Sequence, residues 1–221
     1  MTYKFDPHTH SSEVSRCSIL TATDLVYGYH AAGFGGIAVT DHLYDGLVSD
    51  FDNWDDCVDH ILQGYKNAKA CGDELGLDII LGLEIRFNTN CGDYLAYGLD
   101  EDFLRANPYL HRLGPRKFFK RYRDELLIIQ AHPYRWNDVP NLRCIHGVEV
   151  YNGNPRHANR NNRTQKFCVS HPELYQISAS DAHEPEDIGV GWMEFDRPVA
   201  DSFRFREMIM RGEHKNHIPL N

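Results

Sequence analysis

The chain has 221 residues, of which 42% are apolar, enough for one substantial hydrophobic core. Its 32 acidic and 23 basic residues give a formal charge of −9, which argues against a general affinity for nucleic acid or an anionic membrane. No stretch is long and apolar enough for a membrane span, and no apolar signal core follows the first residues. These features predict a single cytoplasmic domain over residues 1–221, with no membrane partner and with its oligomeric state open.

The chain alternates short apolar runs with longer amphipathic segments, which is typical of α/β proteins. The predicted strands are Tyr3–Asp6, Gly36–Thr40, Asp78–Glu84, Tyr94–Gly98, Leu126–Ala131, Gly147–Tyr151, Tyr175–Ser178 and Gly191–Phe195. Helices are predicted over 23–33, 52–75 and 199–212, the first two ending near a glycine. Residues 155–170 are polar and rich in Asn and Arg, so we interpret them as a segment bordering a site.

Six cysteines lie far apart in the chain and form no CxxC pair. This spacing argues against a zinc knuckle or a redox motif. We therefore expect free thiols, as in a reducing cytoplasm.

Side chains that can bind metals follow five of the predicted strands. In chain order they are His8 and His10, Asp41 and His42, Glu84, His132, and Asp181 and His183. Because the carboxyl ends of parallel strands meet at one edge of a barrel or open sheet, we expect these side chains to form one polar rim.

The local context of these residues favours metal binding. His8 and His10 are two apart, so on an extended segment both point to one face and can share a metal. Glu84 ends an apolar run, where a buried carboxylate needs a metal or Arg86 as its partner, and its two oxygens could bridge two cations. Taken alone, Asp41 and its neighbour also fit a helix cap, and Asp181 also fits a simple turn.

Five motifs in order make the chain resemble the PHP (polymerase and histidinol phosphatase) superfamily. They are Asp6-Pro7-His8-Thr9-His10-Ser11, Ile37-Ala38-Val39-Thr40-Asp41-His42, Gly82-Leu83-Glu84, Ala131-His132-Pro133 and Ser180-Asp181-Ala182-His183. The resemblance runs from the first strand to about Gly191. It implies an α/β fold of a specific kind, a distorted (β/α)7 barrel with metals at its carboxyl-terminal rim.

The resemblance also implies a ligand set for two or three divalent ions. One metal would be held by His8, His10, Glu84 and Asp181, a second by His132 and the bridging Glu84, and a third by His42 and His183. Asp93 stands where three-metal members usually carry a histidine. Arg16 lies where a further ligand is usual, and its guanidinium could bind phosphate or replace a cation. Zinc, manganese and iron all suit such ligands.

The function implied is hydrolysis of a small phosphate ester by metal-activated water. Proton exchange is predicted for Asp41, His42 and His183. The candidate phosphate-binding residues are Arg16, Arg86, Arg135 and Arg156, which could equally be solvated surface charges.

Four alternatives remain open at this stage. The chain could act specifically as a histidinol-phosphate phosphatase, or as a phosphodiesterase or exonuclease on nucleotides or short oligonucleotides. It could also be a non-catalytic metal-binding PHP module, or a hydrolase of carbon–nitrogen bonds, since similar rim chemistry serves both reactions.

Overall fold

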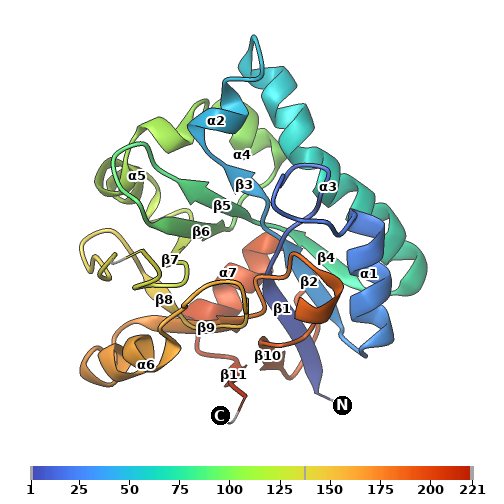
Figure 1. Cartoon of the computed structure of the whole chain (residues 1–221), viewed down its shortest axis with the longest axis vertical. Coiled ribbons are helices and arrows are strands. Elements are labelled where there is room, and N and C mark those ends of the chain that lie inside the picture. Colours follow the sequence, from blue (N-terminus) through green and yellow to red (C-terminus); the bar gives the residue numbers. More distant parts are fainter. Residues whose placement is uncertain (1, 137, 220–221) are drawn as a thin grey trace.

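The computed structural model describes residues 2–136 and 138–219, whose strands form two sheets (Figure 1). The first sheet has the order β11-β10-β1-β2-β4 and the second β3-β5-β6-β7-β8-β9. The strands are β1 Tyr3–Thr9, β2 Gly36–Val39, β3 His42–Leu43, β4 Asp78–Leu81, β5 Leu83–Arg86, β6 Asp93–Tyr97, β7 Leu127–Gln130, β8 Gly147–Asn152, β9 Tyr175–Ala179, β10 Trp192–Phe195 and β11 Lys215–His217. The helices are α1 Ala22–Ala31, α2 Asp45–Val48, α3 Trp54–Leu75, α4 Glu101–Ala106, α5 Pro115–Tyr122, α6 Asn161–Ser170 and α7 Ser202–Met210, with short 3-10 helices at Leu110–Arg112 and Pro185–Asp187.

The two sheets meet along two seams and enclose a distorted α/β barrel. At one seam Gly82 joins β4 directly to β5, and at the other Thr9 pairs in parallel with Ala182, just beyond β9. Counting β4 and β5 as one bent path, the barrel follows β1, β2, β4/β5, β6, β7, β8 and β9. In Figure 1, α1 and α3 flank one side of these strands and α6 lies on the other side.

The bend at Gly82 corrects the prediction of one continuous strand over Asp78–Glu84. A Cβ atom at Gly82 would lie 2.7 Å from Thr40 and 3.0 Å from the Tyr97 ring, so the glycine permits a close backbone approach. The bend sends β4 to β2 and β5 to β3 and β6. It also puts Glu84 in the second sheet, beside His42 in the β3–β5 pair.

The predicted helices are present, with local signals at their ends. The side chain of Thr21 accepts a hydrogen bond from the backbone of Asp24 at the start of α1, and Asn53 caps α3 in the same way. Helix α3 ends at Gly76, whose φ of 72° lies in the left-handed region that favours glycine. The predicted range 199–212 contains α7.

Several elements differ from the strict strand–helix repeat. Strand β6 runs antiparallel to both β5 and β7, with no helix between β5 and β6. The polar segment 155–170 includes α6, in which Thr164 and Cys168 are buried and Phe167 packs against the hydrophobic core. Helices α2, α4 and α5 are too short to show a clear helical period in the sequence, and they were not predicted.

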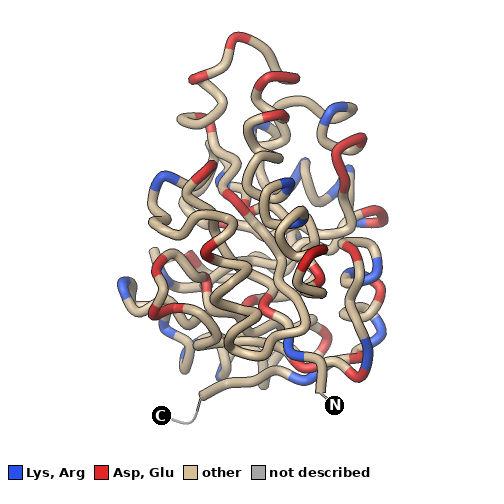
Figure 2. The backbone as a smooth tube through the Cα atoms, turned by 90° about the vertical axis from the view of Figure 1, so that its right-hand side faces the viewer, with Lys and Arg blue, Asp and Glu red and all other residues tan. Residues whose placement is uncertain are grey.

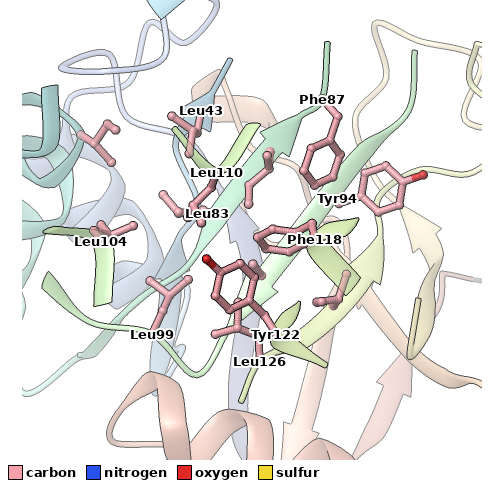
Figure 3. Close-up of a cluster of buried hydrophobic side chains, with 14 of the residues drawn as sticks. Leu43, Leu83, Phe87, Tyr94, Leu99, Leu104, Leu110, Phe118, Tyr122 and Leu126 are labelled. Carbon is pink, nitrogen blue, oxygen red and sulfur yellow. The ribbon is translucent and has the colours of Figure 1, made fainter. Parts of the chain in front are cut away.

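Three hydrophobic clusters hold these layers together. One is formed by the strands and α7, whose Phe205 ring lies 5.4 Å from Phe5 and 4.7 Å from Tyr97. A second packs α1 and α3 against β2 and β4. The third lies between α2 to α5 and the outer face of β5 and β6, where Phe87, Tyr94, Phe118 and other residues meet (Figure 3). These clusters fix the strands whose ends carry the site.

Gly64 on α3 allows this helix to approach the segment after β1, and its replacement tests that packing. An alanine Cβ would lie 2.0 Å from Ser11 Oγ and 2.5 Å from Asp41 Oδ2. We expect Gly64→Ala to lower the free energy of unfolding by about 1–3 kcal/mol through overpacking, although alanine favours helix. Thermal and urea unfolding measure this, with the exposed Gln63→Ala on the same helix as control. An unchanged or higher melting temperature for Gly64→Ala would contradict this packing.

The state of the cysteines, the distribution of charged residues and the length of the helices can be compared with the sequence. All six cysteines are free thiols. In Figure 2, basic and acidic residues are interspersed along the backbone rather than separated onto two faces. No helix among the described residues is both long and apolar enough to cross a bilayer.

Candidate metal centre

The two histidines at the end of β1 lie together and are fully buried. The Nε2 atoms of His8 and His10 are 3.0 Å apart. The segment after β9 runs beside them, because the Asp181 amide donates to the carbonyl of His8 and the His10 amide donates to the carbonyl of Ala182, both at 3.0 Å. The fold therefore brings the two ends of the polar rim into contact.

Four buried side chains form the first group of possible ligands. Glu84 Oε2 lies 3.6 Å from His8 Nε2 and 3.4 Å from His10 Nε2. Asp181 Oδ1 lies 3.4 Å and 3.2 Å from the same two nitrogens. Ligands at 2.0–2.1 Å around a tetrahedral cation are roughly 3.3–3.4 Å apart, so these spacings fit one ion.

The second group lies on the other side of Glu84. Its Oε1 atom is 2.8 Å from His132 Nε2, and that nitrogen is 3.8 Å from Asp93 Oδ2. Donor atoms of Glu84, Asp93 and His132 all lie within 4.8 Å of one another. Each oxygen of Glu84 thus faces a separate set of donors, as a bridging carboxylate requires.

The third group consists of imidazoles. Donor atoms of His10, His42 and His183 lie within 4.8 Å of one another. His42 Nδ1 is 2.8 Å from Glu84 Oε2, and His183 Nδ1 is 2.9 Å from the carbonyl oxygen of Asp181. The thiol of Cys17 also faces this group, with Sγ 3.3 Å from His42 Nε2.

Two of the candidate ligands have a left-handed backbone, which is costly for residues other than glycine. The φ angles are 30° at His132 and 55° at Asp181. The His132 amide donates to Glu149 Oε2 at 2.7 Å, and the Asp181 amide is held by the carbonyl of His8. Hydrogen bonds therefore stabilise the unusual conformations that aim these side chains inward.

The buried charges shift one another's pKa values. Burial raises the pKa of Glu84, but the neighbouring His42 and His8 lower it to well below its usual range. Burial lowers the pKa of His8, but Asp181, Glu149 and Glu84 raise it to well above its ordinary value. Burial together with the charges of His183 and His42 holds the pKa of His10 well below normal. Both carboxylates of the first group are thus kept ionised, as ligation requires.

Asp41, a predicted proton-exchange residue, is held by serines. Its oxygens accept hydrogen bonds from the backbone and hydroxyl of Ser11 and from the hydroxyl of Ser15. Burial raises its pKa to about 6 despite these bonds. Because Ser15 Oγ also lies 3.2 Å from His10 Nδ1, Asp41 is connected to the rim through a serine.

The four candidate phosphate-binding arginines all make ion pairs. Arg86 makes two contacts of 2.7 Å with Asp93, and Arg156 pairs with Asp187. The buried Arg135 donates to Asp181 Oδ2 at 2.8 Å, and to Asn152 and Asn159. Arg16 pairs with Asp50 at the surface. Of the four, Arg16 and Arg86 line a cleft of about 400 Å³ together with Cys17, His42 and Tyr44.

Glu149 was missed by the sequence reasoning. This buried residue of β8 accepts from His8 Nδ1 at 2.9 Å through Oε1, and from the Asn152 amide at 2.9 Å through Oε2. A carboxylate within the apolar strand Gly147–Asn152 is the same signal that identified Glu84. Cys17 was also missed, because a single cysteine in a loop has neither a characteristic spacing nor a position at a strand end that would indicate a functional role.

The residues present fit divalent cations. The donors are imidazole nitrogens and carboxylate oxygens, buried and gathered at the spacing of ligands around one ion. His132 Nδ1 is buried without a hydrogen-bond partner, which is uncommon for a ring nitrogen. The Nδ1 atom of His8 is oriented by Glu149, the arrangement usual for metal-bound histidine. Which ion each residue would bind remains a prediction.

Comparisons with known proteins show which fold the chain shares. Residues 159–213 match the PHP_C family model, which is described as PHP-associated. A two-domain protein from Bacteroides vulgatus, with a predicted PHP-like metal-dependent phosphoesterase, is similar in structure with a TM-score of 0.70 and 19% identity. The similarity covers 99% of this chain and 65% of that protein, so this chain spans about two thirds of its relative's length.

The chain therefore shares the fold of a PHP-like protein, and its residues 159–213 match a PHP-associated family model. Two further structures share the fold of this chain over nearly their whole lengths. A candidate metal-dependent phosphoesterase from Bifidobacterium adolescentis has a TM-score of 0.56 and 15% identity, covering 94% of this chain and 96% of that one. An amidohydrolase from Chromobacterium violaceum, with bound sulfate and no metal, has a TM-score of 0.55 and 16% identity, covering 96% and 97%. No curated protein matches the sequence of this chain.

Proposed function

We propose that this protein is a PHP-type metal-dependent hydrolase that cleaves a small phosphate ester. The observation that carries the proposal is the position of Glu84, whose two oxygens face separate groups of buried donors. When bound, divalent cations at such donors supply Lewis-acid polarisation and lower the pKa of water, so that it can attack at neutral pH. Two-ion centres of this kind are common in phosphatases and nucleases.

The cleft beside the centre supports an anionic substrate. It is lined by two guanidinium groups, from Arg16 and Arg86, although the whole chain carries a net charge of −9. Arginine binds phosphate oxygens through paired N–H donors, and the exposed Arg16–Asp50 pair costs little to open. Tyr44 offers an aromatic surface to the rest of the substrate.

His42 is the imidazole placed to meet the substrate. It lines the cleft, and its Nδ1 atom contacts Glu84. It can serve either as a proton donor to the leaving oxygen or as a ligand. Asp41 is held by serine donors and anchors the loop that carries Ser15, rather than exchanging protons with the substrate.

The test is metal analysis joined to a substrate panel. Protein is stripped of metal with a chelator and reloaded in turn with zinc, manganese and iron. Ion content is then measured, along with the hydrolysis of phosphomonoesters, phosphodiesters and amides. We expect metal-dependent hydrolysis of a phosphomonoester, and a loss of more than about a hundredfold in His10→Ala. The control is His30→Ala, which removes an exposed histidine of α1.

Each other outcome identifies a different function. Cleavage of diesters alone would indicate a phosphodiesterase. Cleavage of amides alone would indicate a carbon–nitrogen hydrolase, which the amidohydrolase relative makes the second candidate. Bound metal with no turnover would indicate a non-catalytic module. Less than about one ion per chain after reloading would contradict the metal centre itself.

A further inference from the structure

A basic segment, residues 112–123, lies on the outside of the second sheet. It includes α5 and holds six arginines and lysines, all exposed, with no acidic residue. Phe118 and Tyr122 of α5 are buried in the core, so the cations face away from it. Because the whole chain has a formal charge of −9, this gathering of positive charge is a local exception.

The cations of α5 are unfavourable for the helix that carries them. Arg116 and Lys117 lie in its first turn, where the positive end of the helix dipole disfavours cations. Each also stands four residues before another cation, Lys120 and Arg121 respectively, and like charges at this spacing repel each other. Among the described residues, no ion pair of these four offsets the repulsion. The arrangement indicates an anionic partner outside the helix.

An acidic segment of matching size is formed by residues 45–59. It holds six aspartates, all exposed, and neither lysine nor arginine. It runs from α2 through the turn that projects at the top of Figure 1 and into the start of α3. Within the part of the chain that the structure describes, Asp52 and Asp56 form no ion pair with a lysine or arginine. The acidic segment therefore also has charge to offer a partner.

The two segments are neighbours on the surface. Trp54 at the start of α3 donates from Nε1 to the carbonyl of Leu104 in α4 at 2.8 Å, and α4 lies between α3 and α5 (Figure 1). Arg112 Nε lies 3.2 Å from Asp45 Oδ1, so the first residues of the two segments are in direct contact. Positive and negative surfaces are thus set side by side at one end of the molecule.

A second copy of the chain complements this pair of segments better than a uniform polyanion does. A nucleic acid or an anionic membrane on the basic segment would also approach the neighbouring aspartates, and that repulsion opposes binding. A second copy brings charges of both signs. Turned about a two-fold axis, it sets its acidic segment against the basic one and its basic segment against the acidic one, so each contact occurs twice.

We propose that this protein forms a two-fold dimer in which the basic segment of each copy docks on the acidic segment of the other. The inference goes beyond the proposed hydrolysis and does not depend on the metal centre. It explains why α5 retains cations that repel one another, because aspartates of the second copy offset them. An interface made mainly of charged groups weakens as salt is added.

Sedimentation of the full chain at increasing protein concentration tests the dimer. We expect a dimer at about 50 mM salt, with a dissociation constant that rises about tenfold or more at about 500 mM. Two charge-reversed variants, Lys117→Glu with Lys120→Glu and Asp52→Lys with Asp56→Lys, should each weaken the dimer by a similar factor. Since these four exposed side chains form no ion pair within the described chain, the monomer should keep its fold, which circular dichroism checks.

A mixture of the two variants gives the sharpest readout. Each variant repels its own copies, but the glutamates of one meet the lysines of the other, so an equal mixture should associate again. Both variants remain net negative, so a general attraction between oppositely charged proteins does not produce this result. The control is Lys166→Glu with Lys215→Glu, which reverses two exposed lysines outside both segments and should dimerise like the wild type.

Three results would overturn the dimer. One is a wild type that stays monomeric at low salt up to roughly 100 µM. Another is a dimer that both charge reversals leave unchanged, and the third is a pair of folded variants whose mixture fails to associate. The wild type is also mixed with a thymidine oligonucleotide or with phosphatidylserine vesicles. If monomeric protein binds either one, that polyanion occupies the basic segment in place of a second copy, and the proposal is again overturned.

Discussion

Replacing Glu84 with glutamine should abolish metal-dependent hydrolysis, with a loss of more than about a hundredfold. Each oxygen of Glu84 faces a different donor group, at 3.4 Å from His10 Nε2 and 2.8 Å from His132 Nε2. Glutamine keeps the shape, but its NH₂ group cannot ligate a cation and its oxygen carries no full charge. One substitution therefore weakens two groups at once. Ion content per chain should fall together with the rate.

The control for this prediction is Glu173→Gln, an exposed glutamate in the turn before β9. It should retain the wild-type ion content and rate. Circular dichroism and thermal unfolding of the metal-free proteins separate a loss of ligation from a loss of fold. If Glu84→Gln binds as many ions as the wild type and hydrolyses substrate at a similar rate, Glu84 does not bridge the two groups.

Glu149→Gln should weaken metal binding by about 10–100-fold, although Glu149 belongs to none of the three donor groups. Glu149 accepts from His8 Nδ1 through Oε1 and from the His132 amide and Asn152 through Oε2. In either orientation of glutamine, its NH₂ group meets a hydrogen-bond donor. A buried mismatch of this kind costs about 1–3 kcal/mol and releases either His8 or the strained backbone of His132.

A positioning role for Glu149 has a distinct signature. The metal concentration that gives half-maximal activity should rise, and the rate at saturating metal should recover to within about tenfold of the wild type. A merely structural role would lower the melting temperature without changing this metal dependence. Equal metal affinity in Glu149→Gln and the wild type would contradict the positioning role, and Glu173→Gln serves again as the matched control.

Much of the rim could be predicted because its signals are local. The spacing of His8 and His10 places both on one face, and the alternating residues of an extended segment do this in any fold. The ends of α1 and α3 follow from Thr21, Asn53 and Gly76, whose capping interactions involve only near neighbours.

The path of the strands was harder to predict from the sequence. Gly82 looks like an ordinary member of an apolar run, and only its contacts with Thr40 and Tyr97 show that the chain bends there and changes sheet. The antiparallel direction of β6 is equally invisible in its composition, because a strand buried on both faces reads as an apolar run in either direction.

The sequence by itself determined which residue types reach the rim. The alternation of side chains along an extended segment decides which face each one lies on, and its position at the end of a strand brings it to the rim. Only the tertiary structure decided their partners. It placed Arg135 on Asp181, Glu149 on His8, and Cys17 on His42, across separations of 25 to 141 residues. Such pairings depend on how distant segments pack, and a short polar side chain carries no local mark of the group that it will meet.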